Sequence, residues 1–373
     1  MKITIVTGAF LPVPPIMGGA IEKAWFALAQ EFTQRGHEVA FVSRKIPQSP
    51  REEIVDGIRH VRVRGFDIPR SLVWLKFLDL LYSMRTMSIL PNADIIVTNT
   101  FWLPLLLRGS RRGKIYVHVG RFPKGQMRFY GKAARLQAPS RAVADAIRME
   151  SPKLSPVIAV IPYPVRSSTK PPPVARDKTI LFVGRVHPEK GVHLLVEAFA
   201  NKARTVFADW KLMIVGPAEK KYGGGGEGYL AQLKRMAESA DGKVLFRGAV
   251  FDPVALGSEF RSASLFVYPS LSEKGEAFGL APLEAMAEGC AVLVSNLACF
   301  HDFLRDGDTG FIFDHRVPKP AEALADKMQQ LIVDQALLAR VAGAGQRRSN
   351  EYSVERVADQ FLADFESLLS SHG

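Results

Sequence analysis

Short runs of aliphatic and β-branched residues alternate along the chain with segments of helical periodicity. In the first half, residues 3–6, 39–43, 95–98 and 115–118 are expected strands, and residues 21–35 have helical spacing. In the second half, the expected strands are 179–183, 211–215, 244–247, 265–268 and 291–294, and the expected helices are 192–200 and 283–288. Such alternation is typical of a parallel sheet covered by helices. The pattern therefore predicts an α/β protein.

Residues 161–178, IPYPVRSSTKPPPVARDK, are rich in proline and lack apolar periodicity, which predicts a linker between two α/β halves that face each other across a hinge. Residues 354–369 have apolar positions at helical spacing and predict a closing amphipathic helix. The glycine-rich residues 220–229 lack the G-K-[ST] ending of a phosphate-binding loop, so we expect a flexible surface loop. We expect domains at 1–165 and 166–350, with residues 351–373 packing back on the first domain.

The length and charge support two domains with different partners. At roughly 150 residues per domain, 373 residues suffice for two cores. The net charge is +12, but residues 1–170 carry 26 basic and 11 acidic side chains, whereas the remainder carries 23 and 26. Only Cys290 and Cys299 are present, which excludes a disulfide framework or a thiolate zinc site and fits a reducing cytoplasm.

Membrane insertion is not expected from the sequence. The opening MKITIVTGAF is interrupted by polar residues and predicts a first strand, and residues 72–82 are too short and too charged to span a bilayer. We expect a cytoplasmic protein. Residues 72–90 fit either an amphipathic helix on a membrane surface or core packing. Between Asp94 and Asp145 there is no acidic residue, but there are ten basic ones: Arg108, Arg111, Arg112, Lys114, Arg121, Lys124, Arg128, Lys132, Arg135 and Arg141. This stretch favours an anionic leaflet or a lipid diphosphate over nucleic acid, for which no motif is present.

Two segments of the second half carry candidate chemistry. Gly184 and Arg185 follow an expected strand, and Lys190 precedes a helix, so backbone N–H groups and two cations could bind a diphosphate. Solvated surface cations are the plain alternative. In SEKGEAFGLAPLEAMAEGCAVLVSN, Glu276 lies in a glycine-flanked loop, and Pro282 is expected to open a helix with Glu284 in its first turn. Glu284 could also be present only because a negative charge stabilises the start of a helix. That explanation does not account for Glu276.

Five motifs in order give the chain a specific resemblance. They are Gly18-Gly19 with AIEKAWFALAQEFTQRGHEV, the strand end YVHVG with His118, APSRAVADAI at Ser140, GRVHPEKG, and EAFGLAPLEAMAEG followed by DGDTGFIF. Together they resemble the retaining GT-B glycosyltransferases of family 4 over nearly the whole chain. The resemblance implies two Rossmann-like domains facing each other across a cleft. It also implies transfer of a sugar from a UDP- or GDP-sugar donor to a glycan, lipid-linked or cell-envelope acceptor.

The resemblance also implies roles for individual residues. Arg185 and Lys190 would bind the donor diphosphate, Glu284 the ribose hydroxyls and Glu276 the donor sugar. The N–H groups after Phe278 would touch the sugar or the diphosphate, so the expected donor-binding segment beside Gly184 is Ala277, Phe278, Gly279 and Leu280. His118 would contact the sugar near the reacting carbon, unless it is a satisfied strand-end histidine. Gly18 and Gly19 would let the backbone approach the phosphates.

The chain departs from the family pattern in three places. Tyr163-Pro164 replaces an Asn-Gly turn, and Ala298 and Cys299 replace two glycines. Asp306-Gly307-Asp308 mimics a metal-binding D-x-D, but it lies in the family's D-G-x-T-G loop, so we expect no metal and no cofactor. The expected mechanism is retaining transfer without a covalent intermediate. The alternatives are a GT-B sugar-nucleotide epimerase and a non-catalytic sugar-nucleotide-binding scaffold; a nicotinamide dehydrogenase is disfavoured because no G-x-G-x-x-G follows the first strand.

Overall fold

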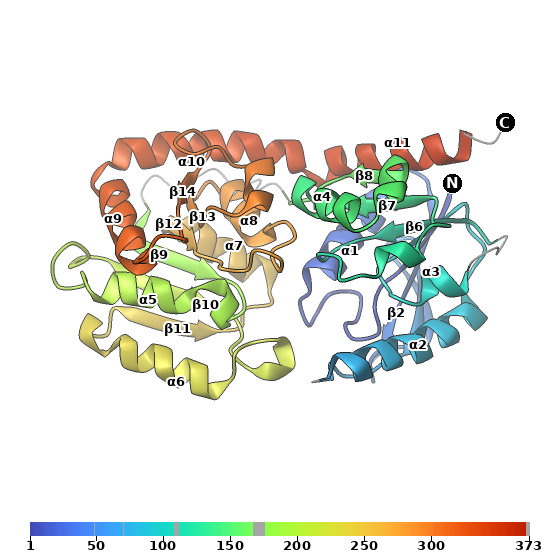
Figure 1. Ribbon diagram of the computed structural model, residues 1–373, viewed down its shortest axis with the longest axis horizontal. Helices are drawn as coiled ribbons and strands as arrows, with labels where there is room; N and C mark the ends of the chain where they lie inside the picture. The colour runs from blue at the N-terminus through green and yellow to red at the C-terminus, as the bar shows by residue number, and fades with distance from the viewer. Residues whose placement is uncertain (48, 70, 108–111, 167–175, 371–373) are drawn as a thin grey trace. The chain divides into compact units, whose positions relative to one another are not determined.

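The chain forms two compact units in the computed structural model, which describes residues 1–47, 49–69, 71–107, 112–166 and 176–370. Unit 1 is Met1–Pro164 with Tyr352–Gly373, and unit 2 is Val165–Glu351. Each unit is a mainly parallel sheet covered by helices (Figure 1). The α/β fold class expected from the alternating pattern is confirmed.

The sheet of unit 1 has the strand order β3-β4-β2-β1-β5-β6-β7-β8. Its neighbouring strands pair in parallel except β3 and β4, a hairpin whose Asp56-Gly57 turn has positive φ at both residues. Its strands are β1 (Lys2–Val6), β2 (Glu38–Lys45), β3 (Glu52–Val55), β4 (Ile58–Arg64), β5 (Ile95–Thr98), β6 (Lys114–His118), β7 (Arg135–Ala138) and β8 (Ile158–Val160). Its helices are α1 (Ala20–Gln34), α2 (Leu72–Ile89), α3 (Leu103–Leu106), α4 (Arg141–Glu150) and α11 (Val354–Ser370).

The C-terminal helix α11 belongs to the core of unit 1. Phe361 and Phe365 pack against Trp25 and Phe32 of α1 and against Tyr116 of β6. The Tyr116 hydroxyl also donates a 2.8 Å hydrogen bond to Asp364 of α11. Helix α2 lies on the other side of the sheet from α11 (Figure 1).

The sheet of unit 2 is parallel, with the order β11-β10-β9-β12-β13-β14. After β9 the chain adds β10 and β11 on one side of β9, and it later adds β12, β13 and β14 on the other side. The strand order therefore reverses between β9 and β12. In parallel α/β sheets, ligands bind at such a reversal, beyond the carboxyl ends of the strands. The strands are β9 (Asp177–Val183), β10 (Lys211–Val215), β11 (Val244–Gly248), β12 (Ala263–Tyr268), β13 (Ala291–Ser295) and β14 (Phe311–Phe313). The helices are α5 (Val192–Ala200), α6 (Glu227–Met236), α7 (Pro253–Ser262), α8 (Leu280–Ala287), α9 (Pro320–Val333) and α10 (Gln335–Ser349).

At residues 220–229, where the sequence predicts a flexible surface loop, the chain instead forms a short turn that leads into α6. Gly225 and Gly226 donate backbone hydrogen bonds to Val186 and Ala218, at 2.8 and 2.7 Å, and α6 begins at Glu227. A Cβ on Gly224 would lie 2.3 Å from the Ala218 backbone. The glycines therefore permit a compact turn packed on the segment after β9.

The linker expected at residues 161–178 is only partly described, because residues 167–175 lie outside the described part of the chain. At its start, Ile161, Tyr163 and Val165 are buried, and at its end Asp177 already begins β9. Both ends therefore belong to packed structure.

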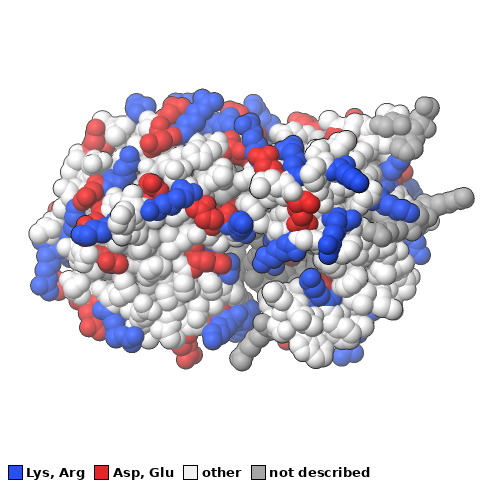
Figure 2. All heavy atoms as spheres, in the orientation of Figure 1, with Lys and Arg blue, Asp and Glu red and all other residues white. Residues whose placement is uncertain are grey.

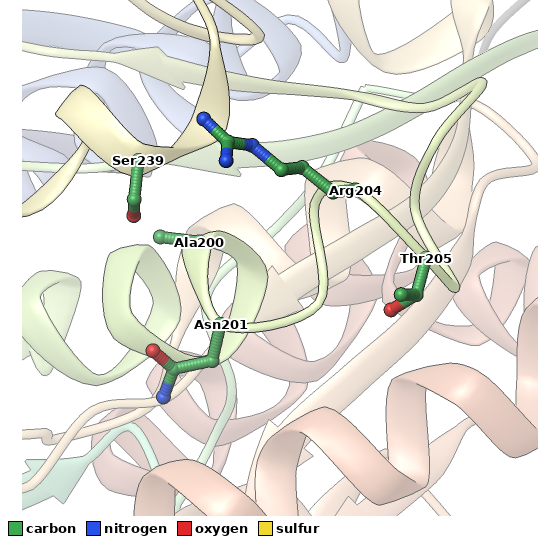
Figure 3. Close-up of a pocket in the computed structure, with 5 residues that line it drawn as sticks. All are labelled: Ala200, Asn201, Arg204, Thr205 and Ser239. Atoms are coloured by element: carbon green, nitrogen blue, oxygen red, sulfur yellow. The ribbon is translucent and has the colours of Figure 1, made fainter.

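A surface hollow lies at the C-terminal end of α5, lined by Ala200, Asn201, Arg204, Thr205 and Ser239 (Figure 3). The Arg204 guanidinium there is held by Asp241 through two 2.8 Å hydrogen bonds. The strand-order reversal lies at the opposite, N-terminal end of α5, so this hollow is separate from the expected ligand site. Among the described residues, no helix is long and apolar enough to cross a membrane.

Candidate functional site

The segment after β9 brings Lys190 to the carboxyl edge of the unit 2 sheet. Gly184 directly follows β9, and Lys190 ends a short 3₁₀ turn that leads through Gly191 into α5. Gly191 has φ 67°, and a Cβ there would lie 1.9 Å from the Pro269 carbonyl oxygen. Glycine is therefore needed for the turn and for close approach to the segment after β12. The Leu271 N–H also bonds the Glu189 carbonyl at 2.8 Å.

Lys190 and Glu276 form a buried ion pair where these two segments meet. The Lys190 Nζ atom lies 2.6 Å from Glu276 Oε2, and the residues are 7% and 8% exposed. Burial alone would lower the pKa of Lys190, but the Glu276 carboxylate beside the ammonium raises it above its ordinary value. The ammonium is therefore charged at neutral pH. Lys190, which is expected to bind the diphosphate, is therefore in direct contact with Glu276, which is expected to bind the sugar.

Tyr268 and Ser270 complete this cluster, and sequence reasoning did not select either. Their hydroxyl groups donate to the same Glu276 Oε2 atom, at 3.2 and 3.1 Å. Burial and the Glu276 carboxylate raise the pKa of Tyr268, which therefore stays a neutral donor. The available signal was their position, because polar residues directly after a parallel strand lie at the ligand edge of the sheet.

Arg185 is about half exposed and is held by its own chain. One Nη atom donates to the Gly223 carbonyl at 2.6 Å, and the other forms an ion pair with Glu189. The pKa of Glu189 is lowered, because the charges of Arg185 and Lys190 outweigh the effect of burial. Two of five guanidinium N–H groups are thus engaged, and the group remains suited to an anion.

Helix α8 begins earlier than expected. It starts at Leu280, so Pro282 is its third residue and Glu284 its fifth, and the expected first-turn position of Glu284 is wrong. Gly279, with φ 93°, forms the N-cap, and a Cβ there would lie 2.4 Å from the Phe300 ring. Proline is tolerated here because the first N–H groups of a helix have no intrahelical partner. The buried Phe278 precedes this cap and packs on Phe303, and Ala277 joins it to Glu276.

In unit 1, Gly18 and Gly19 lead into α1. Both have positive φ, 77° and 100°, and a Cβ on Gly19 would lie 2.2 Å from the carboxyl oxygen of Glu22. Glycine is therefore required here by the turn and by packing of the chain itself. Glu22 is 6% exposed, and burial raises its pKa to about 7 against the weaker opposing effects of a backbone hydrogen bond and of Arg121.

His118, at the end of β6, is buried and makes hydrogen bonds through both ring nitrogens. Nδ1 contacts the side-chain oxygen of Gln137, and Nε2 lies 2.9 Å from the Tyr163 hydroxyl. Burial lowers the pKa of His118 to about 4, although the Gln137 hydrogen bond opposes this shift. These contacts are those of a satisfied strand-end histidine, the alternative that the sequence left open. Tyr163 was noted in the sequence only as a departure in the hinge.

Within the described parts of the chain, no three His, Cys, Asp or Glu side chains gather in a way that could hold a metal ion. Asp306 and Asp308 therefore have no described third ligand of these types. The Asp306 carboxylate instead accepts the Ile312 N–H at 2.8 Å, within its own loop.

Comparison with known families bears on both units. A model described as glycosyl transferases group 1 matches residues 166–348, and one described as glycosyltransferase family 4 matches residues 17–168. The chain belongs to the glycosyltransferase family that these two models describe. Phosphatidyl-myo-inositol mannosyltransferase of Mycobacterium leprae is 33% identical over 196 residues, covering 52% of this chain and 48% of that protein. Lipopolysaccharide 1,2-N-acetylglucosaminetransferase of Salmonella typhimurium is 29% identical over 189 residues, covering 50% and 48%. These matches span about half the length of each relative.

Solved structures agree in fold with this member of the glycosyltransferase family. Sucrose-phosphate synthase from Thermosynechococcus elongatus superposes with a TM-score of 0.82 at 19% identity, covering all of both chains. Anabaena HepE in complex with UDP and glucose gives a TM-score of 0.73 at 19% identity, covering 98% of this chain and all of that one. The expected GT-B fold is confirmed.

Proposed function

We propose that this protein transfers a sugar from a UDP- or GDP-sugar to a glycan, lipid-linked or cell-envelope acceptor. The observation that carries the proposal is the buried Lys190–Glu276 pair at the strand-order reversal of unit 2, with Arg185 on the segment that positions Lys190. This cluster combines cations for a diphosphate with a carboxylate for sugar hydroxyls. The family and the UDP complex of the HepE structure support this assignment.

The leaving nucleoside diphosphate is neutralised by Arg185, Lys190 and the backbone N–H groups of Ala277–Leu280. These groups supply the charge that the reaction needs, so we propose a metal-independent transfer that uses no cofactor. Glu284 accepts hydrogen bonds from the ribose. Gly184 lets the backbone after β9 approach the donor, and Gly18 and Gly19 do the same from unit 1.

We propose retention of configuration without a glycosyl-enzyme intermediate. Glu276 Oε2 accepts hydrogen bonds from Lys190, Tyr268 and Ser270, which stabilises the carboxylate and weakens it as a nucleophile. A carboxylate held in this way is suited to orienting sugar hydroxyls, while the acceptor attacks from the face that the diphosphate leaves. Detection of a glycosyl adduct on Glu276 by mass spectrometry would contradict this part of the proposal.

The test of the main proposal is donor binding followed by transfer. Thermal-shift screening with UDP-, GDP- and ADP-sugars should reveal one preferred donor, whose nucleoside diphosphate is released with an acceptor present. Arg185→Ala should lower this release by roughly 10²–10³-fold, because a preorganised charge is lost from the transition state, and should weaken donor binding less. Lys243→Ala, at a lysine that bonds the Ala203 carbonyl, is the control. Epimerised donor without diphosphate release would favour an epimerase, and binding without turnover would favour a scaffold.

Helix α2 supports a peripheral contact with the inner leaflet of an anionic membrane. Its buried residues are mostly polar, Asp79, Tyr82, Ser83 and Thr86. Its large apolar residues face outward at its first turns: Leu72, Val73, Trp74 and Phe77, with Trp74 58% and Val73 79% exposed. The surface over α2 is mostly uncharged (Figure 2). An apolar face directed outward has the arrangement of an interfacial helix.

Cations border this apolar face. Lys76 lies over the Phe101 ring, and the Trp102 indole donates to the Lys76 carbonyl. The Phe101 carbonyl accepts a hydrogen bond from the Tyr130 hydroxyl. Phe129 directly precedes Tyr130, and the exposed Arg128 stacks on the Phe129 ring. Lys124 and Lys132 are exposed on the same segment, whereas Arg108 and Arg111 lie outside the described residues. Basic side chains beside an apolar face are complementary to anionic lipid.

Vesicle sedimentation tests this contact. The protein should sediment at low salt with vesicles of phosphatidylcholine and phosphatidylglycerol and much less with phosphatidylcholine alone. The double substitution Trp74→Ser and Phe77→Ser should reduce the bound fraction about tenfold, and Val333→Ser, an exposed apolar residue of α9 in unit 2, should not. Equal sedimentation of both variants would contradict the contact.

A further inference from the structure

The side chain of Arg185 is oriented by the chain itself. It is 43% exposed, long and flexible, so without support it would lose rotamer freedom each time an anion binds. One Nη atom, however, donates to the Gly223 carbonyl at 2.6 Å, and the other forms an ion pair with Glu189. A charge that is already oriented needs no reorganisation when the reaction occurs.

The Gly223 carbonyl belongs to the tetraglycine turn, which comprises residues 223–226. Gly223 follows the 3₁₀ turn Lys220–Tyr222 and adopts the left-handed conformation, with φ 80° and ψ 17°. Its N–H donates to the Lys220 carbonyl at 3.0 Å and closes the 3₁₀ turn. The local backbone therefore sets the direction in which the Gly223 carbonyl points.

Val186, the residue after Arg185, joins the tetraglycine turn to the segment after β9. Its carbonyl accepts the Gly225 N–H at 2.8 Å, and its own N–H donates to the Pro217 carbonyl at 2.9 Å. Arg185 and its acceptor Gly223 therefore lie on backbone segments that are hydrogen-bonded directly to each other.

The tetraglycine turn does not have the form of a phosphate-binding loop. A phosphate-binding loop directs its backbone N–H groups at the ligand. Here the N–H groups of all four glycines donate to carbonyl groups of the protein, at 2.7 to 3.0 Å; the acceptors are Lys220, Glu219, Val186 and Ala218. The group with which the turn meets Arg185 is the carbonyl of Gly223.

Glycine at position 223 is required both by the backbone and by Arg185. Its φ of 80° lies in the left-handed region. A Cβ there would lie 3.0 Å from Nη1 and 3.1 Å from Cδ of Arg185. Both atoms belong to a flexible side chain, so an alanine would displace the guanidinium more readily than the turn. Gly242 has a similar φ of 76°, but a Cβ there would have no described atom within 4 Å apart from its chain neighbours.

We propose that the tetraglycine turn is a positioning element of the donor site, which holds Arg185 through the Gly223 carbonyl in the orientation that meets the donor diphosphate. This inference rests on the proposed sugar transfer. It goes further by giving a role to the glycine run, which acts through Arg185 and not through its own N–H groups.

The experiment compares wild type, Gly223→Ala and Gly242→Ala in the release of nucleoside diphosphate from the preferred donor with an acceptor present. Both substitutions place a Cβ at a positive φ, but only the one at 223 presses on Arg185. Gly223→Ala should lower kcat by about 10- to 100-fold, because it misplaces a group that acts on the leaving diphosphate. The donor KM should change less. Gly242→Ala should keep the kcat of wild type.

A double variant tests whether the effect passes through Arg185. With Arg185→Ala already present, Gly223→Ala should change kcat by less than about twofold, because the two residues share one interaction. Gly223→Asn separates strain from contact, since asparagine adopts the left-handed conformation more readily than alanine but places the same Cβ beside Arg185. It should lose as much activity as Gly223→Ala, with a smaller fall in Tm.

Three results would overturn positioning by the turn while sugar transfer stands. They are a wild-type kcat in Gly223→Asn, an equal loss in Gly242→Ala and Gly223→Ala, and a Gly223→Ala effect that persists beside Arg185→Ala. If Arg185→Ala alone releases nucleoside diphosphate at the wild-type rate, the role of Arg185 in the proposed function fails, and this inference fails with it.

Discussion

Glu22 of unit 1 and Glu276 of unit 2 are buried to a similar extent, 6% and 8% exposed, but their surroundings differ. Glu276 receives an ammonium and two hydroxyl groups on one oxygen. Around Glu22, burial outweighs the charge of Arg121 and raises the pKa to about 7. The comparison shows that unit 2 holds its carboxylate in a charged pair, whereas the charge of Glu22 changes near neutral pH.

Breaking the Lys190–Glu276 pair of unit 2 should cause the largest loss of stability. Lys190→Ala leaves the Glu276 carboxylate buried without its cation, which typically costs about 3–5 kcal/mol. Urea unfolding should show this loss, and the double variant Lys190→Ala with Glu276→Gln should recover part of it. Lys202→Ala, which breaks the more exposed pair with Asp326, should cost no more than about 1 kcal/mol. If Lys190→Ala costs no more than this control, the pair does not stabilise unit 2.

Removing the charge of Glu22 should raise the free energy of unfolding, whereas Lys190→Ala lowers it. The unfolded pKa is 4.5 and the folded pKa about 7, so the folded state prefers the protonated form. The associated stability is complete below pH 4.5 and is lost as the pH rises through 7. Glu22→Gln mimics the protonated form, so at pH 8 it should be more stable than wild type by up to about 3 kcal/mol, with little difference at pH 4.

Unfolding of both proteins from pH 4 to 8 measures this effect, with exposed Glu366→Gln of α11 as the control. Asp79, whose pKa burial raises to about 6, should keep a smaller pH dependence in the variant. A difference between Glu22→Gln and wild type that does not change with pH would show that the carboxyl is not the titrating group.

The sequence located segments more successfully than contacts. The strands at 95–98 and 211–215 and the helix at 192–200 have the predicted bounds, because buried parallel strands and an amphipathic helix leave strong apolar patterns. The hairpin of β3 and β4 was missed: Ile54 and Val55 of β3 are exposed, and Arg59, His60 and Arg62 interrupt the apolar pattern of β4. Packing, and not local pattern, decides these elements.

Site chemistry was predictable only as far as it is local. Lys190 and Glu276 were each selected, but their contact joins positions 86 residues apart and needs the fold. The same holds for Tyr163, 45 residues from His118. For α2, periodicity predicted the helix, but it could not show that the polar side faces the sheet.

The hydroxyl groups around Glu276 provide the smallest and sharpest comparison. Tyr268→Phe removes one of three donors to Oε2 and leaves Lys190 and Ser270 in place. Phenylalanine leaves no unsatisfied group of its own, so the cost should be about 1 kcal/mol in urea unfolding, and Ser270→Ala should cost a similar amount. Because the ammonium carries most of the charge compensation, either variant should remain well above Lys190→Ala in stability. If Tyr268→Phe were as damaging as Lys190→Ala, the hydroxyl groups and not the ion pair would supply most of the stabilisation of the buried Glu276 side chain, and the contrast with Glu22 would rest on hydrogen-bond donors instead of a counter-charge.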